Sequence, residues 1–356
     1  MPTLILVKSC CEFKLASRPP AKPLTLLLAG RSSASRENLL KQLLSTEWNI
    51  LTWSEDQAFE RFIDLAPRAD VIVAGRIAGE WPAMPNLRLR QVPSTGLNWI
   101  SPVERPTGCV VCNTYGHEIA IAEYVLAAML ESAIGLSAID RRFRSRGWKD
   151  RKPGIGPNHG ELFGTTVGIV GYGHIGRQVA TRARAFGMEV IAASRTVRPA
   201  PELAWFGTMD ELDRLLTASD FVVVTLPLSE ETEGLFDADR FACMKPEAVI
   251  INVGRGLVID EAALYAALVE KRIGGAAIDV WFQYPTDGDP DCLPSRFPFQ
   301  QLDNVIMTPH GSGSTDAMRE RRWKFVAENL NRFAHGEPLE NVCFDGINPQ
   351  APASSS

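Results

Sequence analysis

The chain has 356 residues, of which 45% are hydrophobic and 22% charged, and its formal net charge is −5. This balance is ordinary for a globular protein long enough for two domains. The negative charge argues against a nucleic-acid partner, and no apolar run approaches the length of a membrane span. Seven scattered cysteines indicate a reducing compartment, so we expect a cytoplasmic location and no disulfide framework.

The first half of the chain predicts a small doubly wound unit. Residues 1–22 are expected to be an N-terminal extension, which ends in the proline-rich stretch 18–23. A helix is expected over residues 39–44. Strands are expected at residues 24–29, 50–53, 71–74, 87–92 and 109–112. Cys109 and Cys112 form a CxxC pair, but the valines between them indicate a buried strand and no second pair lies nearby, so we expect no metal site.

A long apolar pattern at helical spacing then predicts one helix over residues 119–143. A second alternating unit follows it. Its strands are expected at residues 166–170, 189–193, 220–226, 248–253, 275–280 and 304–307. These apolar runs lack polar alternation, which is typical of parallel strands buried on both faces. A last helix, residues 316–333, should return to the first unit.

The glycine motif GYGHIG, residues 171–176, is the most informative stretch. It lies between the strand 166–170 and a helix expected over residues 175–186. Gly171 makes the tight turn, Gly173 lets the backbone approach a pyrophosphate, and Gly176 lets the helix pack on the strand. A diphosphate would then lie at a helix N-terminus, where N–H groups and the helix dipole favour negative charge. The motif in this setting predicts dinucleotide binding.

Five motifs together resemble the D-isomer-specific 2-hydroxyacid dehydrogenase family, which includes phosphoglycerate dehydrogenase, glyoxylate and hydroxypyruvate reductases and formate dehydrogenase. They are GTTVGIVGYGHIG (164–176), LPLSEET (226–232), INVGRGLVID (251–260), AIDVW (277–281) and TPH (308–310). The resemblance implies an α/β fold of two doubly wound parallel-sheet domains, with a Rossmann cofactor domain inserted in a flavodoxin-like substrate domain. The implied domains are residues 23–113 with 311–345 for the substrate and 114–310 for the dinucleotide, followed by a disordered tail, 346–356.

Arg255 and His310 are the expected catalytic pair. Arg255 stands between two glycines after a buried strand, and its guanidinium fork matches a carboxylate. The alternative from spacing alone is an arginine that caps the strand or pairs with a surface acid. His310 follows a strand end, and an imidazole can give and retake the proton that reduction of a 2-oxo acid needs. The resemblance implies that Arg255 holds the substrate carboxylate and that His310 is the acid–base histidine.

The resemblance also implies further binding residues. The backbone of Thr95 and Gly96, in the loop STGLN (94–98), would hold the substrate carboxylate, although an ordinary turn is the simpler interpretation of that loop. Asp279 would bind the nicotinamide carboxamide, and His174 would lie over the pyrophosphate. The remaining positions implied to contact the cofactor are Ile175, Leu226, Pro227, Thr232, Val253 and Gly313.

Two positions depart from the usual pattern of the family. Enzymes specific for NAD place an acid after the second Rossmann strand, whereas this chain has Ser194, Arg195 and Thr196. A hydroxyl removes the repulsion on a 2′-phosphate and Arg195 can pair with it, so NADP(H) is the expected cofactor and NAD(H) the alternative. Tyr284 stands where the family has a Glu that pairs with the histidine. It can orient His310, but a neutral hydroxyl stabilises imidazolium less than a carboxylate does.

We therefore expect an oxidoreductase that transfers a hydride between NAD(P)H and a small 2-oxo acid or D-2-hydroxy acid. One alternative is a formate dehydrogenase-like oxidation, suggested by the segment DVWFQYP (279–285), in which Gln283 lies one position from the glutamine of formate dehydrogenases. Another is a dinucleotide-sensing corepressor without turnover. Relatives are homodimers joined through the long helix of the cofactor domain, so a homodimer is the expected assembly.

Overall fold

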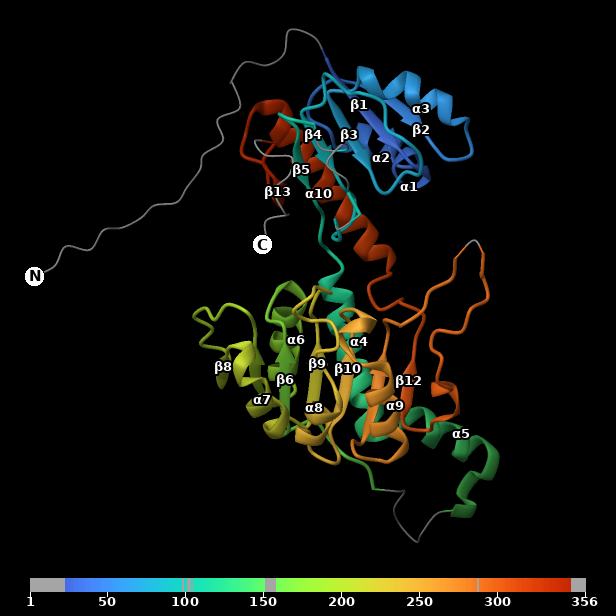
Figure 1. Ribbon diagram of the computed structural model, residues 1–356, viewed down its shortest axis with the longest axis vertical. Helices are drawn as coiled ribbons and strands as arrows, with labels where there is room; N and C mark the ends of the chain where they lie inside the picture. The colour runs from blue at the N-terminus through green and yellow to red at the C-terminus, as the bar shows by residue number, and fades with distance from the viewer. Residues whose placement is uncertain are drawn as a thin grey trace, which may run out of the picture. The chain divides into compact units, whose positions relative to one another are not determined.

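The computed structural model describes residues 23–97, 99–100, 104, 106–150, 158–286 and 288–346. The chain divides into two compact units (Figure 1). Unit 1 comprises residues 1–116 and 316–356, and unit 2 comprises residues 117–315. The predicted domain junctions, 113/114 and 310/311, lie a few residues before these divisions. The predicted N-terminal extension, and all of the predicted tail except Gly346, lie outside the described residues.

Unit 1 contains a six-stranded sheet in the order β13-β5-β4-β3-β1-β2. Its strands are β1 (Leu24–Ala29), β2 (Trp48–Trp53), β3 (Val71–Ala74), β4 (Leu89–Gln91), β5 (Val110–Cys112) and β13 (Val342–Phe344). Its helices are α1 (Arg31–Ala34), α2 (Glu37–Leu43), α3 (Phe59–Leu65) and α10 (Asp316–His335). The strands pair in parallel except β13, which pairs antiparallel with β5 and was not predicted. Alternate residues of β1 enter different cores, Leu26 and Leu28 on one face and Leu27 on the other, which explains its continuous apolar run.

Unit 2 contains a seven-stranded parallel sheet in the order β12-β11-β10-β9-β6-β7-β8. Its strands are β6 (Thr166–Val170), β7 (Glu189–Ala193), β8 (Trp205–Gly207), β9 (Phe221–Val224), β10 (Val249–Asn252), β11 (Gly275–Ile278) and β12 (Val305–Met307). Its helices include α4 (Glu118–Ile134), α6 (His174–Ala185), α7 (Leu212–Ala218), α8 (Ala238–Cys243) and α9 (Glu261–Val269). The strand order reverses between β6 and β9, and ligands of such sheets bind outside the carboxyl ends of the strands at this point.

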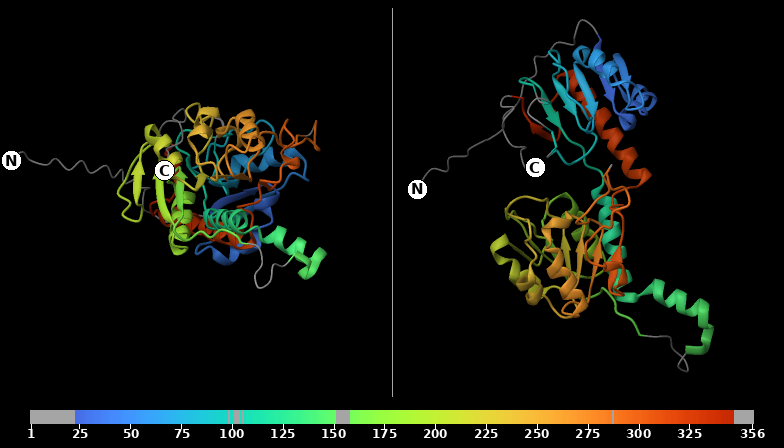
Figure 2. Two further views of the ribbon diagram at one scale, coloured as in Figure 1. Left: turned by 90° about the horizontal axis from the view of Figure 1, so that it is seen from below. Right: turned by 45° about the vertical axis from the view of Figure 1, so that its right-hand side comes forward.

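The predicted single helix over residues 119–143 is wrong, because the chain breaks at Gly135. Gly135 has φ 66° and ψ 37°, a left-handed conformation that closes α4. A second helix, α5 (Leu136–Arg146), then projects from the rest of unit 2 and buries none of its residues (Figure 2). Within the described residues no single helix is long and apolar enough to cross a membrane. Residues 118–149 pass that test only as a pair of helices bent by 50°.

Candidate active site

The predicted site residues of unit 2 follow the carboxyl ends of its parallel strands, which share one edge of the sheet (Figure 1). They are Gly171, Gly173, His174, Ile175 and Gly176 after β6; Ser194, Arg195 and Thr196 after β7; Leu226, Pro227 and Thr232 after β9; Val253 and Arg255 after β10; Asp279 and Tyr284 after β11; and His310 and Gly313 after β12. The topology therefore gathers them, although they are spread over more than 140 positions of the sequence.

The glycine turn has the shape that a bound dinucleotide needs. Gly171 has φ 101°, and a Cβ there would lie 2.8 Å from Thr225 Oγ1. A Cβ at Gly176 would lie 2.5 Å from the Gly171 carbonyl oxygen, so close helix–strand packing requires glycine there. A Cβ at Gly173 would meet nothing within 4 Å, which leaves open space beside the turn. Helix α6 begins without a side-chain cap and without an acidic residue in its first turn, so its N-terminus fits a diphosphate.

The segment after β7 has no acid at the position that NAD-specific enzymes use. Ser194 Oγ donates to the Thr196 carbonyl at 2.8 Å, which folds the segment on itself. Arg195 is exposed and forms no ion pair within the described residues. Further along, Glu202 accepts from the Tyr172 hydroxyl at 2.6 Å, and this bond lowers the pKa of Glu202.

Backbone contacts fix Arg255 at the carboxyl end of β10. A Cβ at Gly254 would lie 2.5 Å from the Leu226 carbonyl oxygen, and a Cβ at Gly256 would overlap the Trp281 carbonyl. The Arg255 side chain is exposed, and Nη1 donates to the Gly254 carbonyl at 2.7 Å. It pairs with no acid in the part of the chain that the structure describes. A cation that has no counter-charge among the described residues is available to an anionic ligand.

His310 is held at one ring nitrogen and open at the other. The Tyr284 hydroxyl lies 2.9 Å from His310 Nδ1 and accepts from the Trp281 backbone N–H at 3.1 Å. The structure therefore brings Tyr284 and His310 together. Within the described residues Nε2 has no hydrogen bond. His310 has φ 55°, a left-handed conformation that is strained for a residue other than glycine.

Asp279 fixes the loop that carries His310. It is 1% exposed, and its carboxylate accepts from Thr308 Oγ1 at 2.7 Å, Gly311 N at 2.9 Å, Ser312 N at 3.1 Å and Ser312 Oγ at 2.5 Å. The Trp281 indole N–H donates to the Thr308 carbonyl at 2.8 Å. Both carboxylate oxygens thus already bind the protein, so Asp279 supports the histidine loop from inside the unit.

Sequence reasoning missed part of this network. The Tyr124 hydroxyl lies 2.8 Å from Thr308 Oγ1. Because the Thr308 hydroxyl proton is donated to Asp279, Tyr124 must be the donor to Thr308. Burial raises the pKa of Tyr124, which keeps its proton in place. A tyrosine within an otherwise apolar helical pattern was the available signal, but its partner lies more than 180 residues away.

The loop of Thr95 and Gly96 belongs to unit 1 and is held by its own contacts. Thr95 Oγ1 donates to the Thr114 carbonyl at 2.9 Å, and Asn113 Nδ2 donates to the Thr95 carbonyl at 3.0 Å. The Trp99 indole N–H donates to the Gly96 carbonyl at 2.8 Å. These contacts make it a fixed turn rather than a loose one: Asn113 and Trp99 hold two of its backbone carbonyls, and Thr114 holds the Thr95 side chain.

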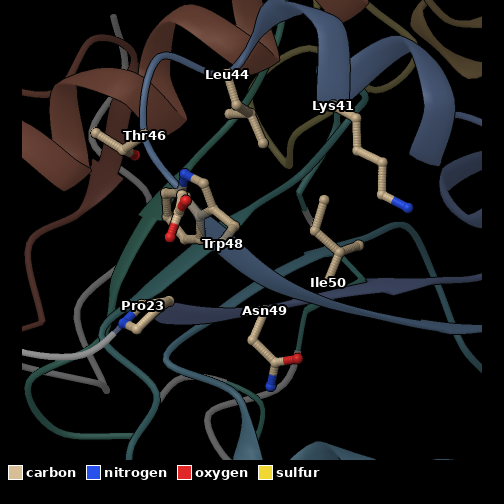
Figure 3. Close-up of a pocket in the computed structure, with 8 residues that line it drawn as sticks. Pro23, Lys41, Leu44, Thr46, Trp48, Asn49 and Ile50 are labelled. Atoms are coloured by element: carbon tan, nitrogen blue, oxygen red, sulfur yellow. The ribbon is translucent and has the colours of Figure 1, made fainter.

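A pocket of about 400 Å³ lies elsewhere in unit 1, over β2 and the end of α2 (Figure 3). Lys41, Trp48 and Ile50 line it, and it contains none of the predicted site residues. Cys109 and Cys112 are buried, and burial raises the pKa of Cys109 to about 12. Among the described residues, no cluster of three or more His, Cys, Asp or Glu side chains could hold a metal ion.

Residues 126–312 match the family model described as D-isomer specific 2-hydroxyacid dehydrogenase, NAD binding domain. The chain belongs to the D-isomer specific 2-hydroxyacid dehydrogenase family. A glyoxylate reductase of Thermococcus onnurineus is 33% identical over 313 residues, which cover 85% of this chain and 91% of that protein. The chain is thus an oxidoreductase of this family that acts on CH–OH groups, with an NAD(P)-binding domain.

Solved structures agree with the fold. A family member from Aeromonas salmonicida superposes with a TM-score of 0.74 at 27% identity, covering 91% of this chain and all of that one. An NADPH-dependent glyoxylate/hydroxypyruvate reductase of Sinorhizobium meliloti gives a TM-score of 0.70 at 25% identity, covering 93% of this chain and all of that one. The two-domain α/β architecture predicted from the sequence is confirmed.

Proposed function

We propose that this dehydrogenase uses NADPH to reduce a small 2-oxo acid, of the glyoxylate or hydroxypyruvate kind, to the D-2-hydroxy acid. The observation that carries the proposal is His310, which is held at Nδ1 by Tyr284 and lies at the same sheet edge as Arg255. Among the described residues, no group competes for the Nε2 of His310 and no acid pairs with Arg255. An acid–base group and an anion-binding cation are the two functions that this reduction needs from the protein. The names of the glyoxylate reductase relatives support the same substrate class.

Each residue has a separate role in the proposed reduction. When bound, NADPH supplies a hydride to the carbonyl carbon of the substrate. Arg255 binds the substrate carboxylate and polarises the carbonyl, and the backbone N–H groups of Thr95 and Gly96 add hydrogen bonds to that carboxylate. His310 gives its Nε2 proton to the carbonyl oxygen. The Tyr284 hydroxyl keeps the ring oriented, because it can accept from the Nδ1–H of the imidazolium.

The residues proposed to contact the cofactor follow the carboxyl ends of the unit 2 strands. We propose that the turn of Gly171, Gly173 and Gly176, with His174 and Ile175, binds the diphosphate. The remaining proposed cofactor contacts are Leu226, Pro227, Thr232, Val253, Asp279 and Gly313. Thr232 already shapes its own loop, since its hydroxyl donates to the Pro227 carbonyl at 2.7 Å. For Asp279 the contact with the carboxamide is secondary to its support of the histidine loop, where it accepts four hydrogen bonds.

We propose a preference for NADP(H) over NAD(H). Ser194, Arg195 and Thr196 support it, because they provide hydroxyls and an unpaired cation and no carboxylate. The test compares kcat/KM for NADPH and NADH. Each ten-fold preference needs only ~1.4 kcal/mol, within reach of one charge-assisted phosphate contact. Changing Ser194→Asp together with Arg195→Ala should reverse the preference, and equal use of both cofactors by the unchanged protein would contradict it.

We also propose a homodimer formed through α4 and α5. Helix α5 buries none of its residues within the chain, and Leu136 and Phe143 are 63% and 49% exposed. Apolar side chains on a projecting helix are typical of a surface covered by a partner. Light scattering after gel filtration should give twice the mass of the chain, and Leu136→Glu with Phe143→Glu should give monomers.

Turnover assays decide the function. Glyoxylate, hydroxypyruvate and formate should each be tested with the phosphorylated and unphosphorylated cofactors. His310→Ala should lower kcat by about two to four orders of magnitude while NADPH binding, followed by fluorescence, is retained. Arg255→Ala should damage both kcat and KM. Oxidation of formate without reduction of 2-oxo acids would favour the formate dehydrogenase alternative. Cofactor binding without any turnover would favour a sensing protein.

A further inference from the structure

An arginine lies buried in the middle of the unit 1 sheet. Arg90, in β4, has no exposed surface, and its guanidinium stacks over the rings of Trp81 and Trp99, with centroid distances of 4.3 and 5.4 Å. Nη1 lies 3.5 Å from Glu104 Oε2 and donates to the Glu104 carbonyl at 3.2 Å. Burial lowers the pKa of Arg90 to about 10, so it stays charged at neutral pH. A buried charge is costly, and an apolar residue would fill a strand at less cost.

The two tryptophans that cover Arg90 differ in what their indole N–H groups do. Trp99 donates to the Gly96 carbonyl at 2.8 Å. Trp81 Nε1 is buried and has no hydrogen-bond partner within the described residues. Arg90 therefore supports, through the ring of Trp99, a direct contact with the loop proposed to bind the substrate carboxylate. Through Trp81 it supports only packing.

A hydrogen bond that fixes the carbonyl of a peptide also fixes the direction of the N–H group of the same peptide. The C=O and N–H of one trans peptide lie antiparallel in a plane. Asn113 Nδ2 holds the Thr95 carbonyl at 3.0 Å and so directs the Gly96 N–H, while Trp99 holds the Gly96 carbonyl and so directs the Leu97 N–H. Neither N–H donates a hydrogen bond to any residue that the structure describes. Both are directed away from the groups that hold their carbonyls.

We propose that Trp99, stacked on Arg90, is a positioning residue for recognition of the substrate carboxylate. It sets the peptide between Gly96 and Leu97, so that the Leu97 N–H, beside the Gly96 N–H that Asn113 directs, remains available to a carboxylate oxygen. The inference rests on the proposed reduction of 2-oxo acids and adds to it the residues that prepare the loop. Preorganised backbone donors lose little entropy on binding an anion, which is why fixing the turn matters for affinity.

The test compares Trp99→Phe with the matched control Trp81→Phe. Both variants keep a ring beside Arg90 and lose one indole N–H, but only the first loses a hydrogen bond to the loop. Trp99→Phe should raise the KM for glyoxylate, and the Kd of the NADP-loaded protein for oxamate, by about five-fold, as expected for one neutral hydrogen bond. Trp81→Phe should leave both constants unchanged. The KM for NADPH should be unchanged in both variants.

Glycolaldehyde, an aldehyde without a carboxylate, separates positioning from general damage. Its kcat/KM should be the same in Trp99→Phe as in the unchanged protein, whereas a damaged fold would lower it together with that for glyoxylate. Arg90→Lys keeps the charge but loses the planar stack, and it should follow the Trp99→Phe pattern more weakly. The glyoxylate and oxamate constants of Trp99→Phe decide the matter even if Arg90→Lys does not fold.

The outcomes distinguish this inference from the proposed function. If the unchanged protein reduces glyoxylate and Trp99→Phe behaves as Trp81→Phe does, the positioning role is wrong and the function stands. If the unchanged protein neither reduces a 2-oxo acid nor binds oxamate, both are overturned. Selective loss of carboxylate affinity in Trp99→Phe alone would support both.

Discussion

Replacing Tyr284 with glutamate tests the hydroxyl partner of the proposed acid–base histidine. The Tyr284 hydroxyl lies 2.9 Å from His310 Nδ1. Reduction consumes a proton and so needs the imidazolium. A carboxylate in this place would favour imidazolium, so the falling limb of the pH profile for reduction should move to higher pH.

The size of the movement follows from the geometry. A glutamate side chain is shorter than tyrosine, so its carboxylate would lie about 5 Å from the imidazolium, and the attraction would be about 1–3 kcal/mol for effective dielectric constants between 80 and 20. Tyr284 is 45% exposed, so the weaker end applies. About 1 kcal/mol corresponds to a movement of about 0.7 pH units.

The assay is kcat/KM for glyoxylate with saturating NADPH, measured from pH 5 to 10. Tyr284→Phe is the control, because it removes the hydroxyl without adding charge. It should lower the rate by loss of orientation and leave the position of the limb nearly unchanged. If Tyr284→Glu leaves the limb where it was while retaining activity, the histidine does not respond to this position and the assignment of Tyr284 is wrong.

Three further predictions concern the framework. Asp279→Asn replaces one of two carboxylate oxygens, each of which accepts from two donors, with an NH2 group that cannot accept. It should therefore lower the free energy of unfolding by about 2–3 kcal/mol in denaturant titration and reduce kcat as the histidine loop loosens; unchanged stability would contradict the role of Asp279. Gly173→Ala should raise the KM for NADPH without loss of stability, whereas Gly176→Ala should lower the melting temperature. Loss of stability in Gly173→Ala but not in Gly176→Ala would contradict the roles assigned to the two glycines. Because its pKa is about 12, the Cys109 thiol should resist iodoacetamide at pH 8 in the folded protein and react on unfolding, as measured by mass spectrometry.

Much of the fold could be predicted because its signals are local. Parallel strands buried on both faces give continuous apolar runs, and the glycine motif marks one strand–turn–helix unit without ambiguity. The long helix was predicted wrongly because Gly135 lies within an unbroken helical pattern. Glycine is tolerated inside helices, and only its left-handed backbone in the structure shows that the chain turns there. Strand β13 was missed because its pairing with β5 depends on residues more than 200 positions away.

The site also has a part that could be predicted from the sequence and a part that could not. Arg255, His310 and the glycine turn follow strand ends, so topology alone gathers them. The supporting network could not be predicted, because its members meet only in three dimensions. Tyr124 lies in no motif, and the motifs that contain Trp281 and Thr308 do not indicate their partners. The same holds for Arg90, which in the sequence is one more cation in a strand. Its burial between two tryptophans is visible only when the sheet is assembled.

The left-handed backbone of His310 sets a limit on how this protein could be improved. Holding a residue with a Cβ at φ 55° costs about 1–2 kcal/mol, which glycine would avoid and asparagine would reduce. A selection that scores only resistance to heat would therefore favour replacement of the imidazole. Libraries built for thermostability should exclude position 310 or be screened for turnover in parallel, since the most stable member and the working enzyme are expected to differ there.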